Sequence, residues 1–523
     1  MRAGRPLTVA AGACVLTAAA VMSPGPAVSV AAPAPRADVV IWPGTQRAGH
    51  ASSAPPTTAY CEASFSIACY EPNQIQQAYN LPALFAHGVT GHKSTIVIVD
   101  SFGSPTIARD LSVFDETFGY PAPPSFSVIQ PAGKVPPYDP SNSDMVGWAG
   151  ETSLDVEYAH TMAPGANILL VETPVSETEG VTGFPQIVAA ENYVINHDLG
   201  DVISQSFSAT EQTFPNKATV ESLRGSYENA YAHHVTVLAA SGDSGAADVG
   251  LDQSTYYLHP VTSWPDSDPL VTGVGGTQLH LNAAGQQTSP DTVWNDTYSV
   301  ATNQYIFTNN GPNPLASGGG TSIFFSRPWY QAGLAGVVGS RRGVPDISMS
   351  AACNGAVDTY QSFGGQTPGW YPVCGTSEAT PLFSGVVALA DQVAGHRLGL
   401  LNPYLYALSA AHAPGIVDVT SGSNTVSFLQ DGKLDTVQGF SALPGYALST
   451  GVGTVNAAAF VPELASWARA PDRERPIDRL PDALVIRILP GAAETHGVDQ
   501  HVNRGVNSNE AGEGAPDASE EAP

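Results

Sequence analysis

The sequence is poor in charge, and especially in positive charge. Asp, Glu, Lys and Arg make up only 13% of its 523 residues, about half the share that is usual in soluble proteins. The 20 Lys and Arg stand against 47 Asp and Glu, which leaves a formal net charge of −27. Because nucleic acids are bound chiefly by cationic side chains, this composition argues against a nucleic-acid partner.

The shortage of cations also bears on behaviour in acid. Once the carboxylates are protonated, the side chains carry at most the 20 charges of Lys and Arg and the 13 of His. A small positive charge limits the self-repulsion that unfolds many proteins at low pH. The composition therefore fits an acidic working environment, and a need for solubility alone is the alternative explanation.

Long apolar runs are missing beyond the N-terminus. There Arg2 and Arg5 precede an apolar stretch from Leu7 to Met22, which is typical of a secretory signal. We assign residues 1–32 to a signal peptide and expect a secreted, extracellular monomer. No later run is long enough to cross a bilayer, so no membrane partner is expected after signal removal.

Cysteines are few, and the CxxC spacing typical of a structural zinc site is missing. Removal of the signal would leave Cys61, Cys69, Cys353 and Cys374. Four cysteines permit three pairings. For an oxidising compartment we favour the two local pairs, Cys61 with Cys69 and Cys353 with Cys374.

Composition divides the rest of the chain into three parts. Residues 33–58 are rich in Pro, Ala and Ser and predict a linker. Residues 59–460 alternate short β-branched apolar runs with helical segments, which predicts an α/β domain with a mainly parallel central sheet. Residues 461–523 mix Pro with acidic residues and predict a disordered acidic tail.

Four apolar runs in this domain predict buried parallel strands. Each is followed by a polar or Gly-rich turn, and in open α/β sheets the site lies at the carboxyl ends of the strands. The functional residues should therefore be sought in these turns. The runs are Thr95–Val99, Ile168–Val171, Val202–Ile203 and Val235–Leu238.

One serine lies in a string that is uncommon by chance. Ser377 belongs to Gly-Thr-Ser-Glu-Ala-Thr-Pro, residues 375–381, just before a stretch with helical character. The positive end of a helix dipole stabilises a developing anion. A lone serine at this place would more often be an N-cap, but the full Gly-Thr-Ser-x-Ala-x-Pro string resembles the nucleophile motif of subtilisin-like folds.

A nucleophilic serine needs a base to accept its proton, and the His-Gly-Thr-His string of subtilisins is absent. Instead, Glu151 and Asp155 lie four residues apart, which on a helix places their Cβ atoms about 5–6 Å apart on one face. If buried, the two carboxyls would share a proton. Glu151 could then act as a base in mild acid, where histidine is already protonated.

The segment from about Tyr60 to Phe460 resembles the sedolisin family of serine-carboxyl peptidases. Single Gly-rich strings would be weak evidence, but several motifs occur here in the family's order. They are Tyr70–Tyr79, Ile96–Asp100, Glu151–Ala166, Ser241–Gly245, Gly273–Thr277, Ser317–Gly320 and the string around Ser377.

The resemblance implies a subtilisin-like three-layer fold and hydrolysis of protein or peptide substrates through an acyl-enzyme at acidic pH. Ser377 would attack the scissile carbonyl, Glu151 would take its proton, and Asp155 would share a proton with Glu151. Asp243 would replace an oxyanion-hole amide. A carboxyl can donate to an oxyanion only while protonated, so its pKa must be raised by its surroundings.

We make separate predictions for four further ionisable residues in or near these motifs. Asp100 ends a predicted strand and is expected to be structural, since the His that it would support is missing. His160 is expected to pack or to face solvent, and Glu157 to point away from the Glu151 face. Glu378 either tunes the pH profile or points to solvent.

The family's calcium site is only partly matched. The family has Asp where this chain has Ala447, and a calcium site weakens when it loses a carboxylate. Asp418 and the carbonyls of Val419, Leu443 and Gly445 would be the remaining ligands, so one calcium ion is an open alternative. Fewer than about sixty residues precede the match, and we expect a family member without the usual long prodomain.

Two other functions compete with peptide hydrolysis. A secreted binding protein could keep the fold without turnover, as the missing calcium carboxylate and short N-terminal segment would suggest. A His-dependent subtilisin-like peptidase is the other alternative, and the missing His string disfavours it. The pH dependence of cleavage and its loss in Ser377→Ala would separate all three.

Overall fold

The computed structural model describes residues 40–41, 46–47, 51–297 and 314–468. The predicted signal peptide and most of the predicted acidic tail, from residue 469 onward, lie outside this range. Among the described parts of the chain, no helix is long and apolar enough to cross a membrane.

The centre of the fold is a mainly parallel sheet in the order β12-β11-β9-β7-β4-β6-β5, with β15 pairing to β11. Its pairs are parallel except for β11 with β12. The four predicted strands are confirmed as β4, β6, β7 and β9. The bounds are β4 Thr95–Ser101, β5 Phe126–Ile129, β6 Asn167–Thr173, β7 Val202–Gln205, β9 Thr236–Ala240, β11 Thr272–Gln278, β12 Thr292–Val293 and β15 Ile347–Ser350.

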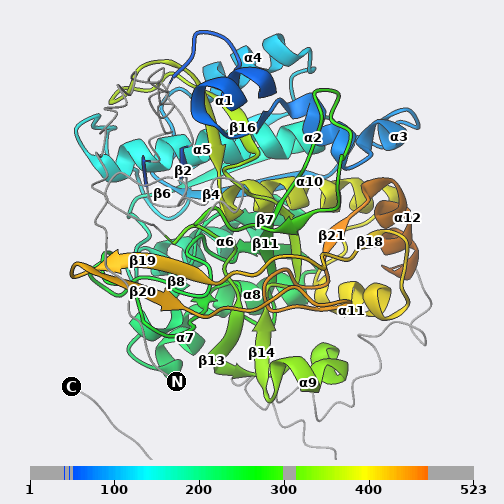
Figure 1. Cartoon of the computed structure of the whole chain (residues 1–523). Helices are drawn as coiled ribbons and strands as arrows, with labels where there is room; N and C mark the ends of the chain where they lie inside the picture. Colours follow the sequence, from blue (N-terminus) through cyan, green and yellow to red (C-terminus); the bar gives the residue numbers. More distant parts are fainter. Residues whose placement is uncertain (1–39, 42–45, 48–50, 298–313, 469–523) are drawn as a thin grey trace, which may run out of the picture. The chain divides into compact units, whose positions relative to one another are not determined.

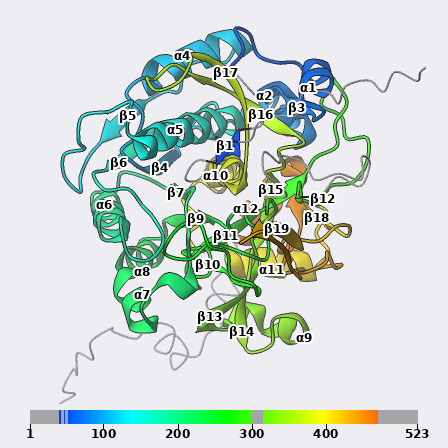
Figure 2. The same ribbon diagram turned by 60° about the vertical axis from the view of Figure 1, so that its left-hand side comes forward.

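Helices cover both faces of this sheet, which confirms the predicted three-layer architecture. Helices α5 (Ser143–Met162) and α10 (Thr376–Ala394) cover one face, while α6 (Phe184–Asn196) and α8 (Gly225–Ala232) lie on the other (Figure 1). Turned by 60°, the molecule shows α5 and α10 side by side (Figure 2). A side chain at Gly385 would overlap Met162, so glycine lets these two helices approach closely.

Helix α5 is buried on all sides, which is unusual for a helix that carries several ionisable residues. Asn142 caps its N-terminus by accepting hydrogen bonds from the N–H groups of Asp144 and Met145. Every residue from Met145 to Met162 is buried. Burying carboxyls costs free energy unless they are protonated or paired, so the buried carboxyls of α5 are candidates for a functional site.

A second, smaller sheet and two disulfides lie near the beginning of α10. Its strand order is β1-β2-β17-β16-β3, and β1 and β2 fall within the range predicted as linker. The disulfides Cys61–Cys69 and Cys353–Cys374 are those that the sequence predicted. The bounds are β1 Val40–Ile41, β2 Gln46–Arg47, β3 Cys69–Tyr70, β16 Ala356–Gln361 and β17 Gly369–Cys374.

The remaining elements surround this framework. The last helix, α12 (Ala457–Ala468), crosses the boundary predicted at residue 460 and buries Phe460, Val461 and Leu464. The others are α1 Thr58–Phe65, α2 Pro72–Ala78, α3 Leu81–Phe85, α4 Ile107–Phe118, α7 Lys217–Leu223, α9 Ala335–Val338, α11 Asn402–Ala410, η1 Glu211–Thr213, η2 Trp329–Leu334, β8 Ala209–Thr210, β10 Ser263–Trp264, β13 Gly320–Ser326, β14 Arg341–Val344, β18 Ile416–Val417, β19 Val426–Gln430, β20 Lys433–Val437 and β21 Thr454–Val455.

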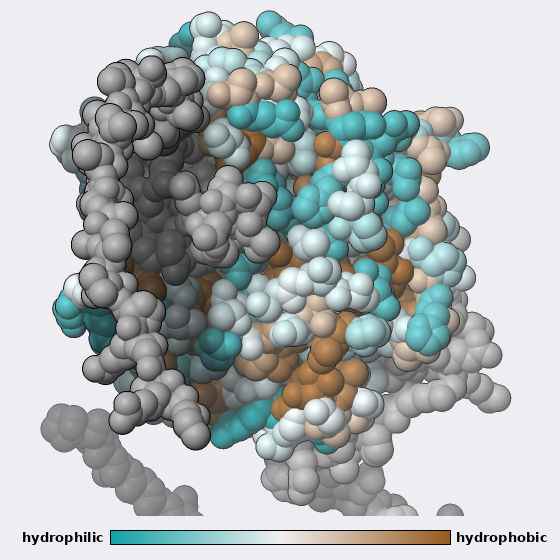
Figure 3. Space-filling model, in the orientation of Figure 1, coloured by the Kyte–Doolittle hydropathy of each residue, from teal (hydrophilic) through white to brown (hydrophobic). Residues whose placement is uncertain are grey.

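The surface mixes polar and apolar residues. On the face drawn in Figure 3, the larger apolar patches lie in the lower half and polar residues border them. Among the described residues, the large hydrophobic side chains with substantial exposure include Leu251, Leu258, Leu429 and Leu434. Singly exposed hydrophobic residues of this kind are normal for a soluble protein.

Candidate active site

Ser377 is the second residue of α10, whereas the sequence placed it just before a helix. Gly375 precedes the helix with a φ of 129°, a conformation that favours glycine. A Cβ at this position would also lie 2.6 Å from Oδ2 of Asp243. The first residue of the motif is therefore glycine for two reasons, its backbone conformation and the close approach of Asp243.

The proline of the motif also has a structural reason. Pro381 lies inside α10, four residues after Ser377. Because proline has no N–H, the carbonyl of Ser377 receives no hydrogen bond from residue 381. That carbonyl instead accepts a hydrogen bond from the Ser206 hydroxyl at 3.3 Å.

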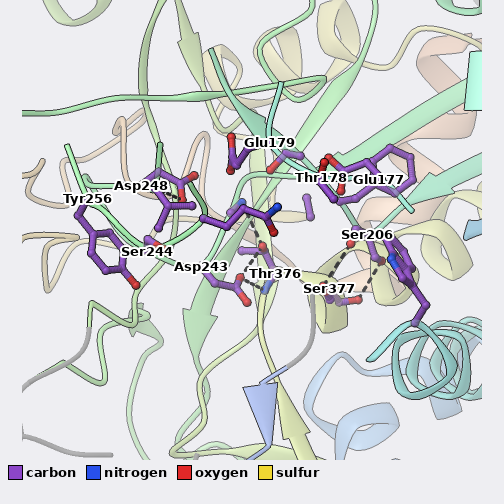
Figure 4. Close-up of a pocket in the computed structure, with 17 residues that line it drawn as sticks. Glu177, Thr178, Glu179, Ser206, Asp243, Ser244, Asp248, Tyr256, Thr376 and Ser377 are labelled. Atoms are coloured by element: carbon purple, nitrogen blue, oxygen red, sulfur yellow. Dashed lines mark hydrogen bonds between the residues drawn. The ribbon is translucent and has the colours of Figure 1, made fainter. Parts of the chain in front are cut away.

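Ser206 joins α10 to α5. It directly follows β7, and its hydroxyl donates to Oδ1 of Asp155 at 2.7 Å. The Ser377 hydroxyl in turn lies 3.5 Å from the carbonyl oxygen of Ser206, and Figure 4 shows the two serines side by side. Sequence reasoning did not assign Ser206 a role, although the polar turn after the predicted strand marked its position.

Glu151 and Asp155 lie one turn apart on α5, and both side chains are fully buried. Burial raises the pKa of Asp155 well above its usual value, and the charges of Asp100 and Glu151 raise it further. These effects favour the protonated form of Asp155.

Asp100, which was expected to be structural, interacts with this pair of carboxyls. It is fully buried, and burial raises its pKa to about 7. Its carboxyl interacts electrostatically with that of Asp155, and neither of its oxygens has a hydrogen bond of ordinary geometry among the described residues. Asp100 therefore adds a third acid to the buried pair.

Asp243 is held against the start of α10 by Thr376. The N–H and the hydroxyl of Thr376 both donate to Oδ1 of Asp243, each at 2.8 Å. The Thr376 hydroxyl also accepts from the N–H of Gly242 at 3.2 Å. Burial raises the pKa of Asp243 to about 7, although the hydrogen bonds from Thr376 oppose the shift. Oδ2 is left as the oxygen that can carry a proton, and Thr376 is a positioning residue that sequence reasoning missed.

The other ionisable residues near the motifs occupy distinct places. Glu378 is fully buried, so the expectation that it might face solvent is wrong. Burial raises its pKa well above the usual range, and Asp243 adds to the shift. Glu157 accepts a hydrogen bond from the N–H of Tyr360, away from Ser377. His160 is buried at the far end of α5, with its Nε2 2.8 Å from the carbonyl oxygen of Pro121.

A cleft with a volume of about 360 Å³ opens beside Ser377. Ser206, Asp243, Thr376 and Ser377 line one part of it, and acidic and aromatic side chains line the rest (Figure 4). None of the described residues that line the cleft is a His, Lys or Arg.

The residues predicted for calcium do not form a set that suits the ion. Asp418 is the one carboxylate among them, and its Oδ1 accepts from the N–H of Gly445 at 3.3 Å. Ala447 is fully buried and hydrogen-bonds with Gly451 through both its N–H and its carbonyl. Within the described ranges, no three His, Cys, Asp or Glu are arranged to hold a metal ion. Calcium sites normally use several anionic oxygens, so these residues do not fit one.

The chain is similar in sequence to known proteins over most of its length. The family model described as the subtilase family matches residues 143–407. Kumamolisin from Bacillus sp. (strain MN-32) is 30% identical over 394 residues, which cover 74% of this chain and 62% of the relative. Sedolisin from Pseudomonas sp. (strain 101) is 29% identical over 374 residues, covering 71% and 57%. The chain thus spans about three fifths of the length of these relatives.

A solved structure supports the same relationship. The structure of Pseudomonas sedolisin, a serine-carboxyl proteinase, complexed with two molecules of pseudo-iodotyrostatin, is similar with a TM-score of 0.61 and 26% sequence identity. The match covers 77% of this chain and 99% of that one. The chain belongs to the subtilase family of peptidases and is homologous to its sedolisin and kumamolisin serine-carboxyl members.

Proposed function

We propose that this chain is a secreted, acid-acting serine-carboxyl peptidase that hydrolyses peptide bonds through an acyl-enzyme on Ser377. The observation that carries the proposal is the arrangement around Ser377. Asp155 on α5 is linked to α10 through Ser206, the buried Glu151 lies one turn before Asp155 on the same helix, and no His is among the described residues that line the cleft. The two disulfides are consistent with an oxidising, extracellular compartment.

In the first step, the Ser377 hydroxyl gives its proton to the carboxylate of Glu151 while its oxygen attacks the scissile carbonyl carbon. Asp155 keeps its own proton, because burial and the neighbouring acids raise its pKa. Before the attack the dyad therefore carries a single negative charge, on Glu151, and after the proton transfer it is neutral while the negative charge lies on the oxygen of the tetrahedral intermediate. Glu151 next gives this proton to the leaving amine, the peptide C–N bond breaks, and the acyl group stays on Ser377 as an ester. In the second half of the reaction Glu151 takes a proton from water while the water oxygen attacks the ester carbonyl. The ester C–O bond then breaks, Ser377 regains the proton from Glu151, and the carboxylic acid product is released.

Asp243 supplies the electrostatic stabilisation of the tetrahedral intermediate. Its Oδ1 is occupied by Thr376, so a proton on Oδ2 is the one available to the oxyanion. Burial raises the pKa of Asp243 to about 7, which keeps it protonated in acid. The reaction therefore needs an ionised Glu151 and a protonated Asp243 together, a combination that mild acid provides.

Cleavage of a fluorogenic peptide library by the secreted protein, measured from pH 3 to pH 8, tests this function. We expect a maximum in acid, complete loss in Ser377→Ala, and loss of at least about 100-fold in Glu151→Gln, because general-base catalysis typically contributes 10²–10⁴-fold. Glu116→Gln, an exposed carboxyl on α4, is the control. A maximum near pH 8, or a Glu151→Gln rate within a few-fold of the parent, would show that the base is another group.

A further inference from the structure

The cleft beside Ser377 has an acidic wall that the proposed chemistry does not use. Glu177 and Glu179 lie between β6 and α6, whereas Asp248 lies after β9, and all three line the cleft (Figure 4). Glu177 is only 7% exposed, and its Oε1 has no hydrogen-bond partner among the described residues. A buried acceptor without a partner is costly, so this oxygen is suited to receive a donor from a ligand.

The other two acids are held in place by the protein. Glu179 accepts hydrogen bonds from the N–H of Thr210 at 2.9 Å and from the hydroxyl of Thr213 at 3.1 Å. Asp248 accepts from the hydroxyl of Ser263 at 3.0 Å. Two loops that follow different strands thus hold Glu179 and Asp248 in place on the cleft that Glu177 also lines.

No cation along the described lining of the cleft balances these acids. Burial and the charge of Asp248 raise the pKa of Glu177 to about 8. Burial, Asp248 and Glu177 raise the pKa of Glu179 to about 9. Because burial and neighbouring negative charges cause these shifts, a positively charged ligand at this wall would offset them. The other titratable groups that interact with the wall are Asp243, Tyr256 and Tyr257.

We propose that Glu177, Glu179 and Asp248 form a subsite that takes the cationic side chain of a Lys or Arg in the peptide substrate. A metal ion is disfavoured, because no three acidic, His or Cys groups among the described residues are arranged to hold one. An ammonium or guanidinium group has several donors for the unpartnered oxygen and its neighbours. The subsite rests on the proposed function, since it selects substrates for cleavage at Ser377.

The subsite should make selectivity depend on pH. In acid the carboxyls of Glu177 and Glu179 are protonated, and binding a cationic side chain to them requires that at least one releases its proton to the solvent. Such release becomes easier as the pH rises. The preference for Lys or Arg over an uncharged side chain of similar length should therefore grow between about pH 3.5 and pH 6.

Paired peptides that differ only in Lys against norleucine, at each of the three positions before the scissile bond, test this subsite. At one position we expect kcat/KM at about pH 6 to favour Lys by tenfold or more, since a charge-assisted hydrogen bond is worth about tenfold to a hundredfold. Glu177→Gln and Asp248→Asn should each remove most of this preference, measured as the ratio of Lys to norleucine cleavage by the same variant. Glu116→Gln should leave this ratio unchanged.

The outcomes separate the two proposals. If the parent protein cleaves both peptides equally at every position and pH, the subsite is wrong and the peptidase function stands. If it cleaves neither peptide of any pair, the peptidase function itself fails. If Glu177→Gln and Asp248→Asn both lose Lys and norleucine cleavage in parallel, the acids support the fold and do not select substrates, which also overturns the subsite.

Discussion

Replacing Asp243 with asparagine tests whether the protonated form of its carboxyl, and not the ionised form, supports the reaction. Oδ1 accepts two hydrogen bonds from Thr376, and Oδ2 faces Gly375. An asparagine side chain fits these demands, because its oxygen can accept from Thr376 while its NH₂ group lies at the Oδ2 position as a donor. Asp243→Asn therefore imitates the protonated acid at every pH, whereas Asp243→Ala removes the donor.

The expected magnitudes follow from this geometry. Loss of one oxyanion donor costs about 10²–10³-fold in rate, or about 2.7–4 kcal/mol, so Asp243→Ala should fall by this amount at its optimum. Asp243→Asn should keep a rate well above that of Asp243→Ala in acid. Because the pKa of Asp243 is raised to about 7, the parent protein loses its donor as the pH rises through that value, and Asp243→Asn should lack this decline.

The assay is kcat/KM for one fluorogenic peptide from pH 3 to pH 8. Asp252→Asn is the matched control, because Asp252 is an exposed residue of the same loop region that accepts hydrogen bonds only within its own turn. If Asp243→Asn is as inactive as Asp243→Ala in acid, a protonated Asp243 is not the oxyanion donor and the reasoning fails.

Three further outcomes are expected. Pro381→Ala restores an N–H that competes with Ser206 for the carbonyl of Ser377, so kcat should fall several-fold with no loss of thermal stability; an unchanged kcat would contradict the role given to proline. Burial raises the pKa of Glu378 in the folded state, so its contribution to stability is complete below its unfolded pKa and is lost as the pH rises. Urea unfolding of Ser377→Ala should therefore show lower stability at pH 7 than at pH 4, and adding Glu378→Gln should flatten the slope by up to about 1.4 kcal/mol per pH unit; an unaltered slope would exclude Glu378. Chelator should leave the Tm unchanged, because Asp418 is the only carboxylate of the predicted calcium set; a chelator-dependent Tm would restore that site.

The sequence predicted the framework because the framework depends on local patterns. The run Thr95–Val99 has apolar residues at nearly every position, which suits a strand buried on both faces, and β4 is such a strand. The spacing of Glu151 and Asp155 likewise depends only on the period of a helix. Both inferences needed no knowledge of distant contacts.

The contacts between motifs could not be predicted in the same way. Ser206 and Asp155 form a hydrogen bond although they are 51 positions apart in the chain. A local sequence pattern cannot predict which residue at the end of a strand will contact which residue of a helix. The role of Pro381 is also invisible until α10 is known to begin at Thr376. Glu378 was misjudged because hydrophilic character usually indicates exposure, whereas the start of α10 lies deep inside this fold.

The hydrogen bonds around Thr376 have a mechanical consequence. They fasten the segment after β9 to the first turn of α10, so thermal motion of either segment carries the other with it. In the mechanism that we propose, the distance between the attacking oxygen of Ser377 and the donor on Asp243 is therefore set by bonds within these two segments. Changes in the other loops of the cleft would alter which substrates bind and leave this distance unchanged.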